Sequence, residues 1–153
     1  MLIPLWQKFI GILIYMLPWS DAIPFGRHLF QDFPFLQWLA LPALPIIFIE
    51  QSIPFGSLLL FFLLFLLIAR NPKIPYFLRF NTLQALLIDI GVILINYGFQ
   101  IIIEPFGSGI IVSTLSSTVL VGILAIVIFA FGECLQGKEP DLPGISEAVR
   151  MQL

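Results

Sequence analysis

Residues 79–104 read RFNTLQALLIDIGVILINYGFQIIIE, and Asp89 is the only charged residue between Arg79 and Glu104. This run exceeds the roughly 20 apolar residues that an α-helix needs to cross a bilayer. A carboxylate at the centre of such a helix costs about 2.5–3.5 kcal/mol on insertion scales, so Asp89 needs protein or water around it. The stretch therefore predicts a membrane-spanning helix over Phe80–Ile103 that carries a polar site.

The composition of the whole chain is that of an integral membrane protein. Its 153 residues are 59% hydrophobic and only 10% charged, whereas soluble domains carry about 25% charged residues. The net charge of −2 offers no basic face for nucleic acid. Cys134 and His28 are the only residues of their kinds, which excludes an internal disulfide, a CxxC site and a histidine-rich metal site. We therefore expect no cofactor, no metal and no nucleic-acid partner.

Five apolar segments follow one another along the chain: Leu2–Leu17, Phe33–Ile49, Pro54–Ala69, Phe80–Ile103 and Ile110–Phe131. The first lacks a basic start and a small-x-small cleavage site, so we assign it to the mature protein. The second contains Pro34, Pro42 and Pro45, which remove backbone donors and disfavour a regular helix. We predict an all-α polytopic membrane helix bundle with four transmembrane helices, the second segment being a Pro-broken interfacial or re-entrant helix. Five spans is the alternative.

The basic residues of the short loops indicate sidedness, because cytoplasmic loops carry an excess of Lys and Arg. With four spans, one side holds Lys8, Arg70, Lys73, Arg79, Lys138 and Arg150, and the other holds Arg27 alone. With five spans, Lys8 becomes the single exception. Both topologies place the Arg70–Arg79 loop and the C-terminus on the cytoplasmic or stromal side, and they leave the N-terminus open.

A narrow polar stripe runs along the helix predicted over Phe80–Ile103. At 100° per residue, Asp89, Asn96 and Gln100 fall within about 40° of one another, and Asp89 lies roughly 15 Å from Arg79 along the helix axis. This stripe is either the polar lining of a pathway or a buried hydrogen-bonded contact between helices. Residue spacing leaves both interpretations open.

A second polar set, which we call the collar, precedes the deep stripe. It consists of Arg70, Lys73, Arg79, Asn81 and Gln84, expected near the cytoplasm-side membrane surface. Positive charge there also follows from topology and from attraction to phospholipid headgroups. The collar is therefore a candidate functional surface with a simpler alternative.

The segment Ile110–Phe131 carries small residues on one face: Thr114, Thr118, Gly122 and Ala125. Small residues at this spacing let helix backbones approach closely, which predicts a packing ridge. The alternative is that the hydroxyl groups line a pore. The chain contains no Ser/His/Asp or Cys/His set and no phosphate-binding loop, so we expect no enzymatic activity.

Several stretches resemble one known family. They are Arg70-Asn71-Pro72, the run Phe77–Asp89, Leu17-Pro18 with Pro24-Phe25-Gly26, Phe33-Pro34, and the tail from Gly137-Lys138 through Leu142-Pro143 and Ser146-Glu147-Ala148 to Gln152. Together they strongly resemble the Tic-twenty family, which comprises a subunit of the chloroplast inner-envelope import translocon and its cyanobacterial and plastid-encoded relatives. The resemblance covers nearly the whole chain. Without a long N-terminal extension, the chain looks like the cyanobacterial or plastid-encoded branch.

The resemblance implies a fold, a location and a role. It implies one integral membrane domain over residues 1–153, in a cyanobacterial or plastid membrane, that forms part of a preprotein-conducting path. It also implies that Arg79, Asn81, Gln84 and Asp89 matter. The expected partners are membrane lipid, other translocon subunits or a second copy, and preprotein substrates. The alternatives are a non-conducting assembly or scaffold protein and a small-solute channel.

Overall fold

A computed structural model describes residues 2–107 and 109–153, and these residues form helices with no strand among them. Four helical segments are long and apolar enough to cross a membrane: Leu5–Asp32, Pro34–Ser52, Tyr76–Phe106 and Ile110–Leu135. A shorter apolar helix spans Gly56–Ala69. The prediction of an all-α bundle with four helices long and apolar enough to cross a membrane is confirmed.

The N-terminal segment is bent rather than straight. It comprises α1 (Leu5–Ile14), α2 (Met16–Ala22), a 3₁₀ turn (Ile23–Gly26) and α3 (Arg27–Asp32). The break between α1 and α2 is explained by Pro18, whose ring clashes with the carbonyl of the residue four positions earlier, Ile14. The bend places Tyr15 and Trp19 in the interior of the bundle, where they are 0% and 2% exposed.

The structure exchanges the roles expected for the second and third apolar segments. Residues Pro34–Ala43 form a 3₁₀ helix that continues into α4 (Leu44–Ser52), so the proline-containing segment is the longer one. Two of its prolines cost little, because Pro34 begins the 3₁₀ helix and Pro45 lies in the first turn of α4, where no intrahelical donor is needed. Pro42 lies inside the 3₁₀ helix. The expected spanning segment is instead the shorter α5 (Gly56–Leu64), extended by a π turn (Phe65–Ala69). The interfacial placement of residues 34–52 stays a prediction.

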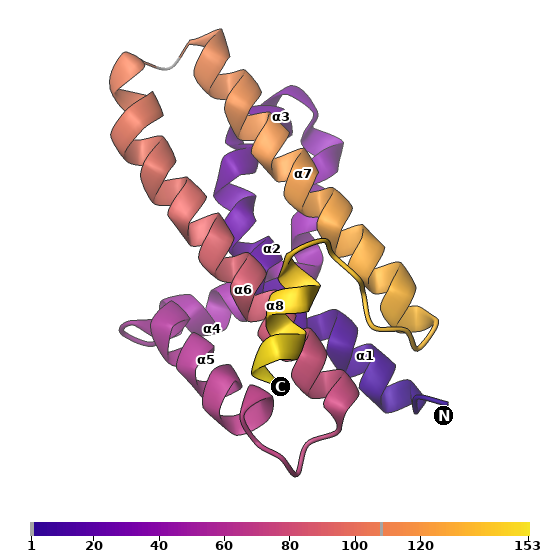
Figure 1. The fold of residues 1–153 in the computed structure, drawn as a ribbon. Coiled ribbons are helices and arrows are strands. Elements are labelled where there is room, and N and C mark those ends of the chain that lie inside the picture. Colours follow the sequence, from indigo (N-terminus) through magenta and orange to yellow (C-terminus); the bar gives the residue numbers. More distant parts are fainter. Residues whose placement is uncertain (1, 108) are drawn as a thin grey trace.

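The helices α1 and α2 pack against both long helices, α6 (Tyr76–Gly98) and α7 (Ile110–Leu135) (Figure 1). A π turn (Phe99–Ile103) and a 3₁₀ turn (Glu104–Phe106) extend α6. The helices α4 and α5 form a hairpin beside the bundle, and the two chain ends lie toward the same end of the molecule (Figure 1). The last helix, α8 (Ile145–Gln152), folds back onto α6.

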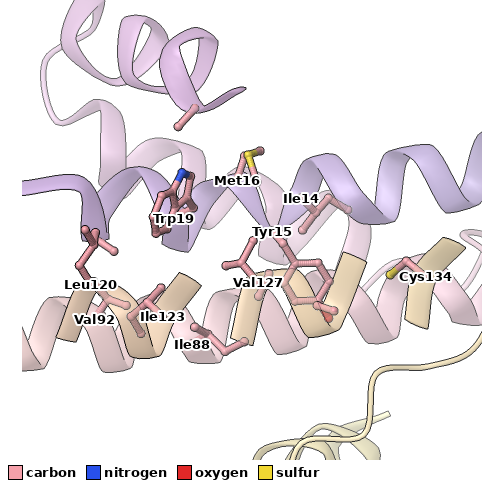
Figure 2. Close-up of a cluster of buried hydrophobic side chains, with 14 of the residues drawn as sticks. Ile14, Tyr15, Met16, Trp19, Ile88, Val92, Leu120, Ile123, Val127 and Cys134 are labelled. Carbon is pink, nitrogen blue, oxygen red and sulfur yellow. The ribbon is translucent and has the colours of Figure 1, made fainter. Parts of the chain in front are cut away.

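The core lies where the bent N-terminal segment meets α6 and α7 (Figure 2). Side chains from the three elements interdigitate there, including Tyr15, Met16, Trp19, Ile88, Val92, Leu120, Ile123 and Val127. The indole Nε1 of Trp19 also donates a 2.9 Å hydrogen bond to the carbonyl of Leu39, which ties the 3₁₀ helix to α2. This core holds the polar side chains of α6 against α2.

Candidate functional site

The structure divides the predicted deep stripe of α6 into two parts. Asp89 is 2% exposed, Asn96 is half-buried and Gln100 is exposed. Gln100 Nε2 lies 3.5 Å from Asn96 Oδ1, so these two amides stay together. Asp89 is instead buried against α2.

Asp89 belongs to a cluster of three carboxyl groups from three helices. Its carboxyl group lies close to Asp21 on α2 and in the field of Glu50 on α4. Each member has a buried oxygen without a hydrogen-bond partner: Oδ1 of Asp89, Oδ2 of Asp21 and Oε1 of Glu50. Carboxyl oxygens accept hydrogen bonds, and among the described residues no donor reaches these three atoms.

A cavity of about 440 Å³ adjoins this carboxyl cluster. Its lining comes from α2, the following 3₁₀ turn, α4, α5 and α6, and includes Ser20, Asp21, Glu50, Gln51, Ser57 and Asn96. We call it the acidic cavity. Asp21 and Glu50 were not predicted as site residues, although each is a single charge at the end of an apolar stretch. Only the fold brings them to Asp89.

A second cavity, of about 350 Å³, lies toward the end of α6 that carries Glu104. Its polar lining residues are Arg27, His28, Asn96, Gln100, Glu104 and Ser116. We call it the mixed-charge cavity. Asn96 lines both cavities, so polar side chains follow α6 from its centre to this end.

The collar is also divided by the structure. Arg70 and Lys73 are exposed and Arg79 is half-buried, with its Nε donating to the carbonyl of Ala69 at 3.3 Å. Asn81 and Gln84 are 0% exposed and therefore do not lie at a surface. Their side chains point into the bundle because α1, α2 and α8 cover that face of α6.

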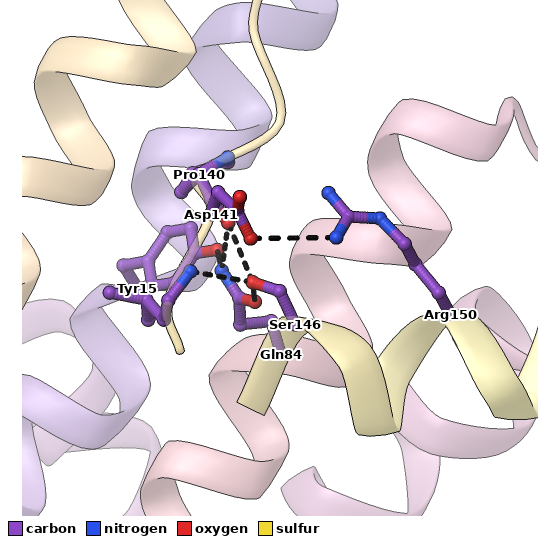
Figure 3. A network of polar contacts seen from close by, with 7 residues as sticks. Tyr15, Gln84, Pro140, Asp141, Ser146 and Arg150 are labelled. Atoms are coloured by element: carbon purple, nitrogen blue, oxygen red, sulfur yellow. Dashed lines mark hydrogen bonds and ion pairs between the residues drawn. The ribbon is translucent and has the colours of Figure 1, made fainter. Parts of the chain in front are cut away.

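Asn81 and Gln84 join a buried hydrogen-bond network with Tyr15 and the C-terminal tail. Figure 3 shows Gln84 between Tyr15 and the tail residues Pro140 and Ser146. The hydroxyl of Tyr15 donates to Asn81 Oδ1 at 2.8 Å. Gln84 Nε2 donates to the Tyr15 hydroxyl at 3.0 Å and to the Pro140 carbonyl at 2.9 Å. Ser146 Oγ donates to Gln84 Oε1. These contacts fasten the tail to the membrane helices. Nothing in the sequence indicated that Tyr15 and Ser146 take part in such a network.

The predicted packing ridge of α7 faces away from the rest of the chain. Thr114, Thr118, Gly122 and Ala125 are all exposed, and a Cβ added to Gly122 would meet no atom within 4 Å. Packing inside the chain uses another face of α7, with Leu120, Ile123 and Val127. The ridge is therefore open to lipid or to another helix.

The chain is similar to proteins of one family over nearly all its length. A family described as "Chloroplast import apparatus Tic20-like" matches residues 4–149. A Tic20 family protein of Synechocystis is 37% identical over 148 residues, covering 96% of this chain and 92% of that protein. Protein TIC 20-v of Arabidopsis thaliana is 33% identical over 150 residues, covering 96% of this chain and 71% of that protein.

A second Arabidopsis relative, protein TIC 20-II, is 30% identical over 153 residues, covering 98% of this chain and 74% of that protein. These relatives come from a cyanobacterium and from chloroplasts. With the four long apolar helices, they indicate an integral membrane protein of a cyanobacterial or plastid membrane.

Proposed function

The chain belongs to the Tic20 family of chloroplast import-apparatus proteins, and we propose that it is a membrane subunit of a protein translocation apparatus. In this role it lines part of the path taken by a translocating polypeptide. Its work is to bind and guide a chain, with no bond made or broken. The observation that supports this role is the pair of polar cavities that share Asn96 inside an apolar bundle.

Polar cavities at membrane depth suit a polypeptide path because a chain in transit carries backbone amides and polar side chains. Lipid offers these groups no hydrogen bonds, and each unsatisfied one costs several kcal/mol. Amide, hydroxyl and carboxyl side chains that line the two cavities supply replacement partners for such groups. A cavity of about 440 Å³ admits only a few residues of a chain, so the complete path includes other subunits or further copies.

Membrane lipid, other translocon subunits or further copies, and preproteins are the proposed partners. The exposed Arg70 and Lys73 of the collar lie before α6, where positive charge marks the cytoplasmic or stromal side. The bond between Ser146 and Gln84, in the first half of α6, supports the same side for the C-terminal tail.

Substitution of the stripe amides tests the pathway role. Asn96→Leu and Gln100→Leu remove polar groups from the two cavities while retaining side chains of similar size. We expect either variant to assemble normally and to slow transport of a preprotein in cells depleted of the endogenous protein. Normal transport by the normally assembled double variant contradicts the pathway role.

The exposed ridge of α7 supports a second candidate function, that of a non-conducting assembly protein. Its small residues leave room for a partner helix to approach closely. If the chain is an assembly protein, we expect Thr118→Leu on this ridge to release a copurifying membrane subunit. Asn96→Leu should then leave both assembly and transport intact. The pathway role predicts instead that Asn96→Leu slows transport, so this pair of variants separates the two functions.

A further inference from the structure

The acidic cavity has the chemistry of a site for an organic cation. Its lining contains the carboxylates of Asp21 and Glu50 together with the polar side chains of Ser20, Gln51, Ser57 and Asn96, and none of its lining residues is basic. Within residues 2–107 and 109–153 the one ion pair joins Arg150 to Asp141 at the opposite end of α6. The two cavity carboxylates therefore have no cationic partner among the residues described.

Asp89 adds a third carboxyl group beside the cavity lining. It is 2% exposed, it faces Asp21, and its Oδ1 atom is buried without a hydrogen-bond partner. Buried polar atoms in folded proteins nearly always have a partner, and each one without a partner calls for an explanation such as a bound group. A cation held between Asp21 and Glu50 would compensate one negative charge of this cluster.

The size and geometry of the site favour an organic cation over a metal ion. Across the described residues, no group of three or more His, Cys, Asp or Glu side chains converges closely enough to hold a metal. The cavity of about 440 Å³ is also far larger than one ion. A guanidinium group instead presents five N–H donors in a planar fork that spans separated carboxylates and amide oxygens.

We propose that the acidic cavity binds the guanidinium or ammonium group of a basic side chain carried by a polypeptide. Asp21 and Glu50 receive the charge, Asn96 and Gln51 accept further hydrogen bonds, and Asp89 adds its field from behind Asp21. That the cation belongs to a polypeptide rests on the proposed function. The cavity selects basic side chains because its carboxyl groups compensate their positive charge, whereas lipid tails cannot.

A pair of peptides tests the proposal on the unaltered protein. Both are fluorescent decapeptides of leucine, serine and alanine with blocked ends; one has a central arginine and the other a central citrulline, its uncharged near-isostere. Binding is measured by fluorescence anisotropy to the purified protein in nanodiscs of zwitterionic lipid. We expect the arginine peptide to bind at least about tenfold more tightly, because loss of a desolvated charge pair has at least that effect. Equal binding of the two peptides overturns the proposal.

Three charge-neutralising variants locate the binding to this cavity. Asp21→Asn and Glu50→Gln preserve side-chain shape and should each reduce the preference for arginine at least about tenfold. Asp32→Asn removes the same charge from the exposed end of α3, outside both cavities, and should leave the preference unchanged. A preference that survives in Asp21→Asn and Glu50→Gln contradicts the assignment.

The peptide experiment and the transport experiment can contradict the two proposals independently. Peptides that differ in affinity, combined with normal transport by the Asn96→Leu and Gln100→Leu double variant, contradict the pathway role and leave the cation site standing. Peptides that bind alike, combined with impaired transport, overturn the cation site and leave the pathway role standing.

Discussion

Gln84 shows how one buried amide can fasten two parts of a membrane protein. Its side chain is 0% exposed and bonds to the Tyr15 hydroxyl, the Pro140 carbonyl and Ser146. Tyr15 lies in the bent N-terminal segment, whereas Pro140 and Ser146 lie in the C-terminal tail. A single residue of α6 therefore connects the two ends of the chain.

Replacement of Gln84 by leucine should loosen the C-terminal tail. The side chains are similar in volume, but Gln84→Leu leaves buried polar atoms with fewer partners, each of which costs about 1–3 kcal/mol. We expect a lower thermal unfolding midpoint in detergent and faster tryptic cleavage after the exposed Lys138.

The matched control for this variant is Gln100→Leu. Gln100 is exposed and its one side-chain bond, to Asn96, is long at 3.5 Å. This substitution should leave both the unfolding midpoint and the cleavage rate unchanged. Equal effects of the two substitutions would show that the Gln84 network does not hold the tail.

At the scale of elements, the hairpin of α4 and α5 depends on a close backbone approach at Gly56. A Cβ atom on this residue would collide with the backbone carbonyl of Glu50. The preceding Phe55 has a positive φ of 58°, a conformation that side chains rarely adopt. The turn is therefore tight, and Gly56 permits it.

Gly56→Ala should destabilise the hairpin, whereas Gly122→Ala on the open face of α7 should not. Backbone atoms cannot move aside as side chains do, and such overpacking costs about 1–3 kcal/mol. Gly122 has open space at the Cβ position, and alanine is the better helix former. Thermal unfolding of the two purified variants measures the difference; equal midpoints would contradict the tight turn.

The two central apolar segments show what the sequence could predict about the elements and what it could not. Hydropathy predicted four long apolar helices and one weaker segment, but it made the proline-containing segment the weaker one, whereas the shorter helix is Gly56–Ala69. It could not show that residues 34–52 remain helical, because the prolines are harmless only at particular helix positions. The sequence shows where the prolines are along the chain. It does not show which turn of a helix each proline occupies, because that depends on where the helix begins.

The positions of the polar residues of α6 were also predicted only in part. Helical periodicity grouped Asp89, Asn96 and Gln100, but it placed Asn81 and Gln84 near a surface because distance from Arg79 was the only guide. In the structure α8 returns to cover that surface. Tyr15, Ser146, Asp21 and Glu50 come from distant parts of the chain, so their meeting with α6 depends on tertiary packing.

At the scale of the whole molecule, α6 and its extension fix the positions of the basic loops. The segment Tyr76–Phe106 has 31 residues, a length of about 45 Å at 1.5 Å per residue. Lys73 precedes it, and Arg27 lines a cavity with Glu104 near its other end. The two basic residues therefore lie at opposite ends of the longest apolar segment.

Labelling of single cysteines checks this arrangement. In a Cys134→Ala background, Arg27→Cys should react with a membrane-impermeant maleimide added outside intact cells or sealed organelles. Lys73→Cys should react only after permeabilisation, because positive loops stay on the cytoplasmic or stromal side. Labelling of both cysteines from the same side would refute the topology.

Site-specific photo-crosslinking from α6 tests the central claim of a polypeptide path most directly. A photoreactive amino acid at position 96 faces both cavities, whereas the same group at Leu94 is on an exposed apolar face of that helix. During transport, a radiolabelled preprotein arrested in transit should crosslink to position 96 and not to position 94. Crosslinks from position 96 to a fixed membrane subunit alone, with none to the arrested preprotein, would contradict the account.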